Sequence, residues 1–292
     1  MLSDPQLHYL DNAATSRVGP AVAQAGSEAL TELWANPSSL YDPAVSAQDA
    51  IAAARARVAK TLHCRSDEIY FTACGSESNN MAIYGAAMPR RHWGNKIVVT
   101  GFEHPSVQRP IRALKDEGFT VVEVMPGADG RIDTQKFLAE IDKNTVLAAC
   151  MAVNNETGAV NDIAAVARML KAENSIALLH TDAVQGFLKV PFSAKTLGAD
   201  MITISGHKIH APKGIGALYI RSGLKLPPYI LGGGQERGMR AGTEATPQIA
   251  AFGTAAEIGS AKMAQATKTM AELRAHAIDR LTAEVDGLVV IG

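Results

Sequence analysis

The hydrophobic positions along this chain fall into two alternating patterns. Short apolar runs rich in valine and isoleucine are separated by longer segments in which apolar residues recur every three or four positions. The first pattern is typical of buried β-strands and the second of amphipathic helices. The runs that we expect to be strands are residues 69–72, 96–100, 120–124, 146–151, 176–181, 200–204 and 215–220. Residues 9–15 are expected to form a further short strand that ends in turn and capping residues. Their alternation with helices predicts an α/β domain with a mostly parallel sheet.

The clearest helical stripe lies in the segment that begins at Ala44. Its apolar residues, spaced by three or four positions, are Ala47, Ile51, Ala54, Val58 and Leu62. This spacing places them on one face of a helix. Arg55, Arg57 and Lys60 lie off the stripe and are expected in solvent. Further helices are expected near residues 20–33, 133–141, 162–173 and 247–285.

Composition narrows the functional classes. Of the 292 residues, 47% are hydrophobic and 20% charged, as in ordinary globular proteins. The net charge of −1 predicts neither a nucleic-acid partner nor an acidic membrane surface. No apolar run is long enough to cross a bilayer and the N-terminus lacks a signal-peptide pattern, so a cytoplasmic location is expected. Three widely spaced cysteines form neither a disulfide framework nor a zinc pattern, and no metal site is expected.

Polar side chains gather where the predicted strands end, which is where α/β sheets bind ligands. Lys208 follows the strand at 200–204, and desolvation there can turn its ammonium group into a nucleophilic amine. Asp182 ends the preceding strand. Pyridoxal 5'-phosphate (PLP) needs a lysine for its aldehyde and a carboxylate beside its ring nitrogen. Lys208 and Asp182 therefore predict a PLP site.

A phosphate cup is predicted from two other segments. Gly75 and Ser76 occupy a strand-to-helix turn, where backbone N–H groups and a hydroxyl can bind an anion. Ser205 and His207 are expected to complete the cup. A glycine-rich loop at residues 231–243, which ends in Thr243, is a further candidate for anion binding through backbone N–H groups.

Ring neighbours complete the predicted site. His104 is expected to stack on the ring and transfer protons, which makes it a catalytic candidate with Lys208 and Asp182. Asn155 and Gln185 are expected to hydrogen-bond the ring oxygen. Singly, each residue also fits a structural role, such as a core histidine, an Asx turn or a helix cap. Their common position at strand ends favours the cofactor site. The sequence has neither a P-loop nor the nucleophile elbow of hydrolases.

Seven motifs together resemble the cysteine desulfurases, which belong to the class V aminotransferase group of fold-type I PLP enzymes. The motifs are residues 9–15, 36–39, 103–104, 153–158, 181–185, 205–208 and 240–243. The resemblance implies a fold-type I PLP-dependent transferase with a mostly parallel seven-stranded sheet and helices on both faces. Residues 14–258 would form this large PLP-binding domain. Residues 1–13 and 259–292 would be parts of an incomplete small domain.

The resemblance also implies an activity and partners. L-Cysteine would be converted to L-alanine, and its sulfur would pass to an acceptor thiol for the synthesis of iron–sulfur clusters or other sulfur-containing cofactors. Lys208 would hold PLP and move the Cα proton. The protein would be a homodimer in which Thr243 reaches the phosphate of the neighbouring subunit's cofactor. A sulfur-acceptor or scaffold protein would be a further partner.

The sequence departs from the family pattern at two places. Its phosphate loop reads Ala-Cys-Gly-Ser at 73–76, which still supplies the expected contacts. Family members continue past position 292 with a sulfur-accepting cysteine, and none of Cys64, Cys74 and Cys150 has a matching context. The chain is therefore expected to bind PLP, as a whole enzyme or as the cofactor-binding portion of one. The alternatives are another class V PLP enzyme (a cysteine or selenocysteine lyase, or an aminotransferase) and a non-catalytic dimeric scaffold.

Overall fold

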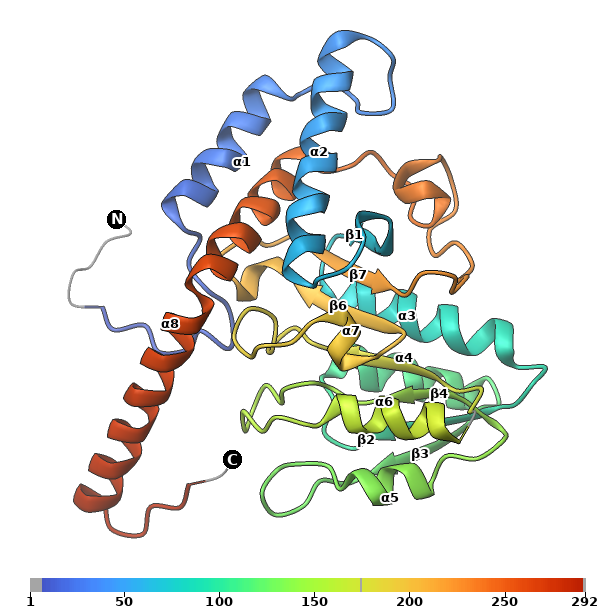
Figure 1. Cartoon of the computed structure of the whole chain (residues 1–292), viewed down its shortest axis with the longest axis vertical. Helices are drawn as coiled ribbons and strands as arrows, with labels where there is room; N and C mark the ends of the chain where they lie inside the picture. The colour runs from blue at the N-terminus through green and yellow to red at the C-terminus, as the bar shows by residue number, and fades with distance from the viewer. Residues whose placement is uncertain (1–6, 174, 291–292) are drawn as a thin grey trace.

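The computed structural model describes residues 7–173 and 175–290, and a seven-stranded sheet forms its centre (Figure 1). The strands are β1 (Ile69–Thr72), β2 (Lys96–Thr100), β3 (Thr120–Val124), β4 (Thr145–Ala149), β5 (Leu178–Asp182), β6 (Met201–Ser205) and β7 (Gly216–Ile220). Their order is β1-β7-β6-β5-β4-β2-β3. β7 is antiparallel to both of its neighbours, whereas the other neighbouring pairs are parallel. The predicted mostly parallel seven-stranded sheet is confirmed.

Helices cover both faces of the sheet. They are α1 (Pro20–Glu32), α2 (Asp42–Thr61), α3 (Gly75–Arg90), α4 (Pro105–Asp116), α5 (Thr134–Ala139), α6 (Ile163–Ala172), α7 (Ala194–Leu197) and α8 (Thr246–Glu284). α3 and α4 contribute to one hydrophobic core, and α2, α6, α7 and the first half of α8 contribute to the other. The sheet is thereby the middle layer of an α/β sandwich.

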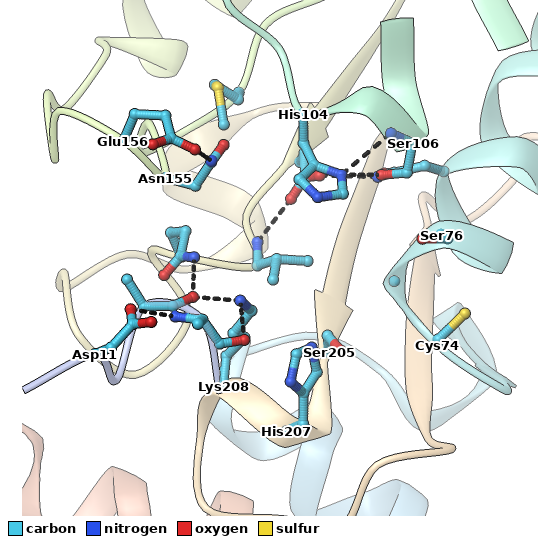
Figure 2. A pocket seen from close by; sticks show the side chains of 18 residues that line it. Asp11, Cys74, Ser76, His104, Ser106, Asn155, Glu156, Ser205, His207 and Lys208 are labelled. Carbon is cyan, nitrogen blue, oxygen red and sulfur yellow. Dashed lines mark hydrogen bonds between the residues drawn. The ribbon is translucent and has the colours of Figure 1, made fainter. Parts of the chain in front are cut away.

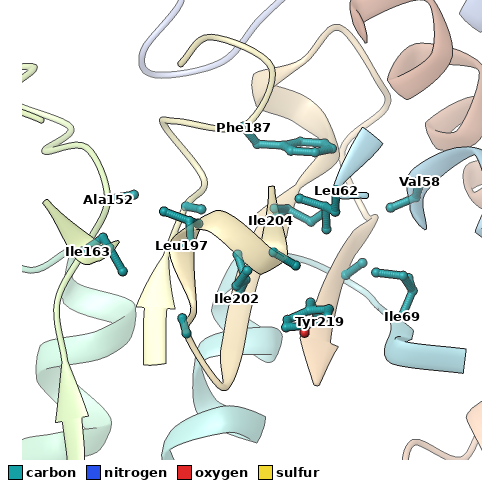
Figure 3. Close-up of a cluster of buried hydrophobic side chains, with 14 of the residues drawn as sticks. Val58, Leu62, Ile69, Ala152, Ile163, Phe187, Leu197, Ile202, Ile204 and Tyr219 are labelled. Carbon is teal, nitrogen blue, oxygen red and sulfur yellow. The ribbon is translucent and has the colours of Figure 1, made fainter. Parts of the chain in front are cut away.

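The side chains of β6 show how the two cores are separated. Met201 belongs to the core beneath α3 and α4, whereas Ile202 and Ile204 belong to the opposite core. Figure 3 shows Ile204 beside Leu62 and below Phe187, with Ile202 further down in the same cluster. These four side chains are at most 1% exposed. Burying a side chain of this size stabilises the fold by about 1.5–3 kcal/mol, so the sheet gives rigid support to the loops at its ends.

The predicted apolar stripe of α2 is buried. Its residues, all at most 6% exposed, are Ala47, Ile51, Ala54, Val58 and Leu62. The stripe packs against α8. Arg57 and Lys60 are exposed, as predicted.

The prediction that Arg55 lies in solvent is wrong. Its guanidinium donates to both carboxylate oxygens of Glu236 at 2.7 Å and to the Ile69 carbonyl at 2.8 Å. Glu236 is buried and also accepts the Phe71 N–H at 2.9 Å. The pair ties α2 to the glycine-rich loop near a 3₁₀ turn, η3 (Gln235–Gly238). Because its partners are 181 positions apart, no local sequence pattern reveals it.

The strand predicted at residues 9–15 is also wrong, because residues 7–15 form no strand in the structure. The Ala14 N–H closes a turn on the Asp11 carbonyl at 3.1 Å and on the Asp11 carboxylate at 3.2 Å. Such side-chain acceptors compete with strand pairing. The segment is instead fastened to the end of the sheet, where the backbone N–H and the hydroxyl of Ser16 both donate to the His207 carbonyl at 2.8 Å.

Burial changes abruptly along α8. Its buried residues end at Ala256, and from position 261 onward most side chains are exposed. In Figure 1 this second half extends beyond the body of the sheet domain. Within residues 7–173 and 175–290, no helix is both long and apolar enough to cross a membrane.

Candidate active site

A cavity of about 520 Å³ opens at one end of the sheet, and it is lined by the segments that follow β1, β2, β4, β5 and β6 and by the N-terminal segment (Figure 2). Nine of the ten residues predicted for the site line this cavity. They are Gly75, Ser76, His104, Asn155, Asp182, Gln185, Ser205, His207 and Lys208. The tenth, Thr243, lines a different cavity.

Lys208 lies in a 3₁₀ turn, η2 (Gly206–Lys208), directly after β6. Its Nζ donates to the backbone carbonyls of Ala13 and of Ala14, the second at 2.8 Å. Burial lowers the pKa of Lys208, against the opposing charges of Asp11 and Asp182. The amine is therefore held at the cavity wall with a raised fraction of its neutral, nucleophilic form.

Asp182 ends β5 and is 4% exposed. One carboxylate oxygen accepts the Val184 N–H at 2.9 Å, and the other accepts the Asn79 amide at 2.8 Å. Burial raises the pKa of Asp182, although these hydrogen bonds and the charges of His104 and Lys208 act the other way. None of the ion pairs in the described part of the chain includes Asp182. The cavity thus contains a buried carboxylate that suits a cationic ligand atom.

The turn between β1 and α3 forms another wall of the cavity. α3 begins at Gly75, and the first N–H groups of a helix have no partner within that helix. A Cβ at position 75 would lie 3.1 Å from Val184 Cγ2 and 3.4 Å from Ser205 Cβ, so glycine allows the turn to pack closely here. Ser205 Oγ is buried without a hydrogen-bond partner among the described residues. A phosphate group would satisfy both the helix terminus and this hydroxyl.

The remaining predicted residues make contacts within the protein. Gln185 Nε2 donates to the Ala13 carbonyl at 2.9 Å, and Gln185 Oε1 accepts from Lys189 at 3.3 Å. Asn155 donates to Glu156 at 2.7 Å. His207 Nδ1 lies 3.1 Å from the Thr15 hydroxyl. Gln185 and Lys208 therefore share the Ala13 carbonyl as an acceptor.

His104 caps the N-terminus of α4, with Nδ1 directed at Ser106. Thr243 is exposed and lies on the other side of the phosphate turn, in a cavity lined also by Ala73 and Arg240. The Arg240–Glu77 ion pair, at 2.8 Å, fastens the glycine-rich loop to α3. The structure thus brings together the nine predicted site residues that end or follow strands of the sheet, and it leaves Thr243 outside their cavity.

Sequence reasoning missed four residues near the cavity: Asp11, Asn79, Ser106 and Lys189. Asn79 and Ser106 had a usable signal, because Asn79 lies one helical turn after Gly75 and Ser106 two positions after His104. Lys189 lies four positions after its partner Gln185. Burial lowers the pKa of Lys189 to about 8, so it is a second amine of reduced basicity close to Lys208.

Together these residues fit PLP. Lys208 could offer an amine to the aldehyde, Asp182 could offer a carboxylate to the ring nitrogen, and Gly75, Ser76 and Ser205 could form a cradle for the phosphate. In the described part of the chain no three histidine, cysteine or acidic residues gather as a metal site. The fold and this set of groups define a PLP-dependent α/β enzyme of the aminotransferase type.

Comparison with known proteins narrows this class. Residues 8–292 match the family described as aminotransferase class-V. A curated cysteine desulfurase of Nostoc sp. is 42% identical over 97% of this chain and 70% of its own length. A solved NifS-like protein superposes with a TM-score of 0.92 at 36% identity, over 94% of this chain and 75% of the other. A structure titled SspA in complex with cysteine gives 0.83 at 38% identity, over 86% and 72%. The chain belongs to the cysteine desulfurase family of class V aminotransferases, as its motifs predicted.

Glu103, the residue before His104, should make the stability of the fold depend on pH. It is fully buried and accepts from the Thr100 hydroxyl at 2.6 Å and the Met151 N–H at 2.5 Å, and burial raises its pKa from 4.5 to about 8. Between these pH values the folded state keeps a proton that the unfolded state releases, so stability falls as pH rises. Glu103→Gln should remove this loss and be more stable than wild type at pH 8 by about 2–4 kcal/mol.

The measurement is urea unfolding of both proteins between pH 4.5 and 8. The two curves should converge at the acidic end. Glu140→Gln, at an exposed position, is the control and should follow wild type. A wild-type stability that stays level across this pH range, relative to Glu103→Gln, would show that Glu103 ionises normally.

Proposed function

We propose that this chain is a PLP-dependent cysteine desulfurase that converts L-cysteine to L-alanine and passes the sulfur to an acceptor thiol, for iron–sulfur cluster or related cofactor synthesis. The observation that carries this proposal is the shared cavity of Lys208 and the buried Asp182, in a chain whose curated relatives are cysteine desulfurases. The solved relative that holds cysteine supports the substrate.

Each residue of the cavity is assigned a role that follows from its position. When bound, PLP supplies an electron sink for a carbanion at the substrate Cα. Lys208 would bind the cofactor and, once released by the substrate amine, move the Cα proton. Asp182 would keep the ring nitrogen protonated, and Gly75, Ser76, Ser205 and His207 would hold the phosphate. His104 would stack on the ring and serve in proton transfer, and Asn155 and Gln185 would contact the ring oxygen.

The acceptor thiol is proposed to lie outside the three cysteines of this chain. Burial raises the pKa of Cys64 to about 12, and Cys150 is fully buried with its pKa also raised. Cys74 lines the cavity but caps α3, accepting the Glu77 N–H at 3.4 Å. None is a mobile thiolate of the kind that sulfur transfer needs. All three are unpaired, which supports a cytoplasmic, reducing location that cell fractionation would test.

The test is incubation of the purified chain with PLP and L-cysteine, with dithiothreitol for the quantification of alanine and sulfide and without it for the quantification of protein-bound sulfur. We expect slow alanine formation with an equal amount of sulfide and no persulfide on the protein. Cys74→Ser should behave like wild type. Persulfide on Cys74 would overturn the assignment of the acceptor, whereas pyruvate in place of alanine would identify a different class V reaction. Cofactor binding without any product would favour the scaffold.

We also propose a homodimer in which Thr243 reaches the cofactor phosphate of the neighbouring subunit. Two features support it. Thr243 is exposed and outside its own subunit's cavity. Large apolar side chains are exposed on the same loop and at the α1–α2 tip, including Leu231 at 83%, Trp34 at 71% and Leu40 at 96%. Sedimentation velocity at micromolar concentration tests the dimer, and a monomer would contradict it.

We further propose that residues 14–258 form the large PLP-binding domain and that residues 1–13 and 259–292 belong to a small second domain. The ends of that second unit, 1–6 and 291–292, lie outside the described residues. The support is the loss of burial along α8, whose outer half exposes Met270, Leu273 and Leu281. Limited proteolysis should cut this outer half first and leave the remainder intact. Cleavage confined to residues before 258 would contradict the division.

A further inference from the structure

A continuous chain of hydrogen bonds connects Asp182 to His104 along the cavity wall. Figure 2 shows its last contact, between Ser106 and His104. Asn79 Nδ2 donates to Asp182 Oδ2 and to Ser106 Oγ, both at 2.8 Å. The Ser106 hydroxyl lies 2.7 Å from His104 Nδ1, and the Ser106 backbone N–H donates to the same nitrogen at 3.1 Å. Four residues from three separate elements are thereby joined without a gap.

The chemistry of the groups fixes the direction of these bonds. A backbone N–H can only donate, so His104 Nδ1 is an acceptor and carries no proton. A neutral imidazole carries one proton, which must then be on Nε2. Ser106 Oγ accepts one hydrogen of the Asn79 amide, which leaves its own hydrogen free for His104 Nδ1. The other Asn79 hydrogen is used by Asp182.

We propose that Asn79 and Ser106 are positioning residues that hold neutral His104 as its Nε2–H tautomer and link this tautomer to Asp182. His104 then offers an N–H donor, not a basic nitrogen, through Nε2. Within the proposed function this assigns His104 to hydrogen bonding or proton donation and leaves proton abstraction to Lys208. Only this last step rests on the proposed function, because the tautomer follows from the contacts alone.

The burial of the hydrogen-bonded residues Asn79 and Asp182 supports this role. Asn79 is 1% exposed and Asp182 is 4% exposed. Hydrogen bonds at such sites are poorly screened by water and hold their partners in one geometry. Asn79 Oδ1 has no partner among the described residues, so the two donor contacts are what orient the amide. The hydrogen bond between Asn79 and Ser106 also joins α3 to α4. The test must therefore distinguish a loss of this packing contact from a change in the His104 tautomer.

Other charges around the cavity must stay constant in the test. The titratable groups that line it, besides His104, are Asp11, Cys74, Glu156, Asp182, His207 and Lys208. Glu103 is buried next to His104 and is electrostatically coupled to Asp182. Substitution of Ser106 leaves all of them in place. Ser106→Thr keeps the hydroxyl and is the matched control for Ser106→Ala, which removes it.

The experiment is a long-range ¹H–¹⁵N correlation spectrum of the whole chain, labelled with ¹⁵N-histidine and recorded without added cofactor. His104 is assigned by its loss in His104→Asn. We expect an unprotonated Nδ1 and a protonated Nε2 on neutral His104. In Ser106→Ala the fraction of neutral His104 that carries its proton on Nδ1 should rise by about 2–10-fold, because one donor to Nδ1 is lost. Ser106→Thr should match wild type.

The link to Asp182 is tested by a double-mutant cycle with Asp182→Asn. The change in the ratio of the two neutral His104 tautomers caused by Asp182→Asn should be larger in wild type than in the Ser106→Ala background. A proton on Nδ1 in wild type would overturn the proposal without any variant. Equal tautomer ratios in the Ser106→Ala and Ser106→Thr variants, or strict additivity in the cycle, would also overturn it. An inactive chain with the expected tautomer would contradict the proposed function and leave this inference standing.

Discussion

Lys208→Ala should abolish covalent capture of PLP and lower L-cysteine turnover by about 10²–10⁴-fold or more. The expected loss is large because one amine is assigned two tasks, attachment of the cofactor and movement of the Cα proton. No other lysine lines the main cavity in the part of the chain that the structure describes. Borohydride reduction of the loaded protein, followed by peptide mapping, should give a pyridoxyl label on Lys208 and none in the variant.

Two lysines serve as controls for this experiment. Lys213 is exposed five positions after Lys208, and Lys213→Ala should label like wild type. Lys189 is the stronger competitor, because its pKa is lowered to about 8 and it lines a groove together with Lys208. A label on Lys189 or Lys213 in the wild-type chain would show that Lys208 has been assigned the wrong role.

Asp182→Ala should lower turnover nearly as severely while leaving PLP bound. Without a carboxylate beside it, the ring nitrogen loses its proton and the carbanion at Cα is poorly stabilised. A charge-assisted hydrogen bond contributes about 1.5–3 kcal/mol, so cofactor affinity should fall by only about 10–150-fold. Cofactor titration and alanine formation, measured on the same preparation, separate the two effects.

Asp182→Asn distinguishes charge from volume at the same position. Its amide can still accept the Val184 N–H, but it has no charge for the ring nitrogen. We expect it to be as inactive as Asp182→Ala, with better folding. Wild-type turnover in Asp182→Asn would exclude the proposed role of the carboxylate and reduce Asp182 to a residue that organises the loop after β5.

The sheet was predictable because each strand has a local signature. The runs at 96–100 and 120–124 became β2 and β3 without a shift in their ends. The short strand predicted in residues 9–15 does not form, whereas the turn predicted at its end does, and there the Asp11 carboxylate accepts the Ala14 N–H. Arg55 was misjudged for a different reason. Its partner Glu236 comes from a loop far along the chain, and hydrophobic periodicity says nothing about such a pairing.

The candidate site was predictable where parallel strands end together. Lys208 and His104 follow β6 and β2, and Asp182 ends β5, so topology alone brings them to one edge. The contacts between the side chains were not predictable. The Asn79 amide and the Ser106 hydroxyl meet because α3 and α4 pack side by side. The sequence of neither helix predicts the distance between the two helices.

The position of β1 at the sheet edge has a consequence for biosynthesis. β1 pairs with β7, and the Tyr219 hydroxyl that reaches Glu68 is 151 positions later in the chain. At about 5–20 residues per second, a ribosome needs roughly 8 to 30 seconds to make that distance. During this interval β1 has no partner strand, and the apolar stripe of α2 is not yet covered by α8. The domain therefore closes by joining segments far apart in the chain, so its folding is completed only after α8 has left the ribosome.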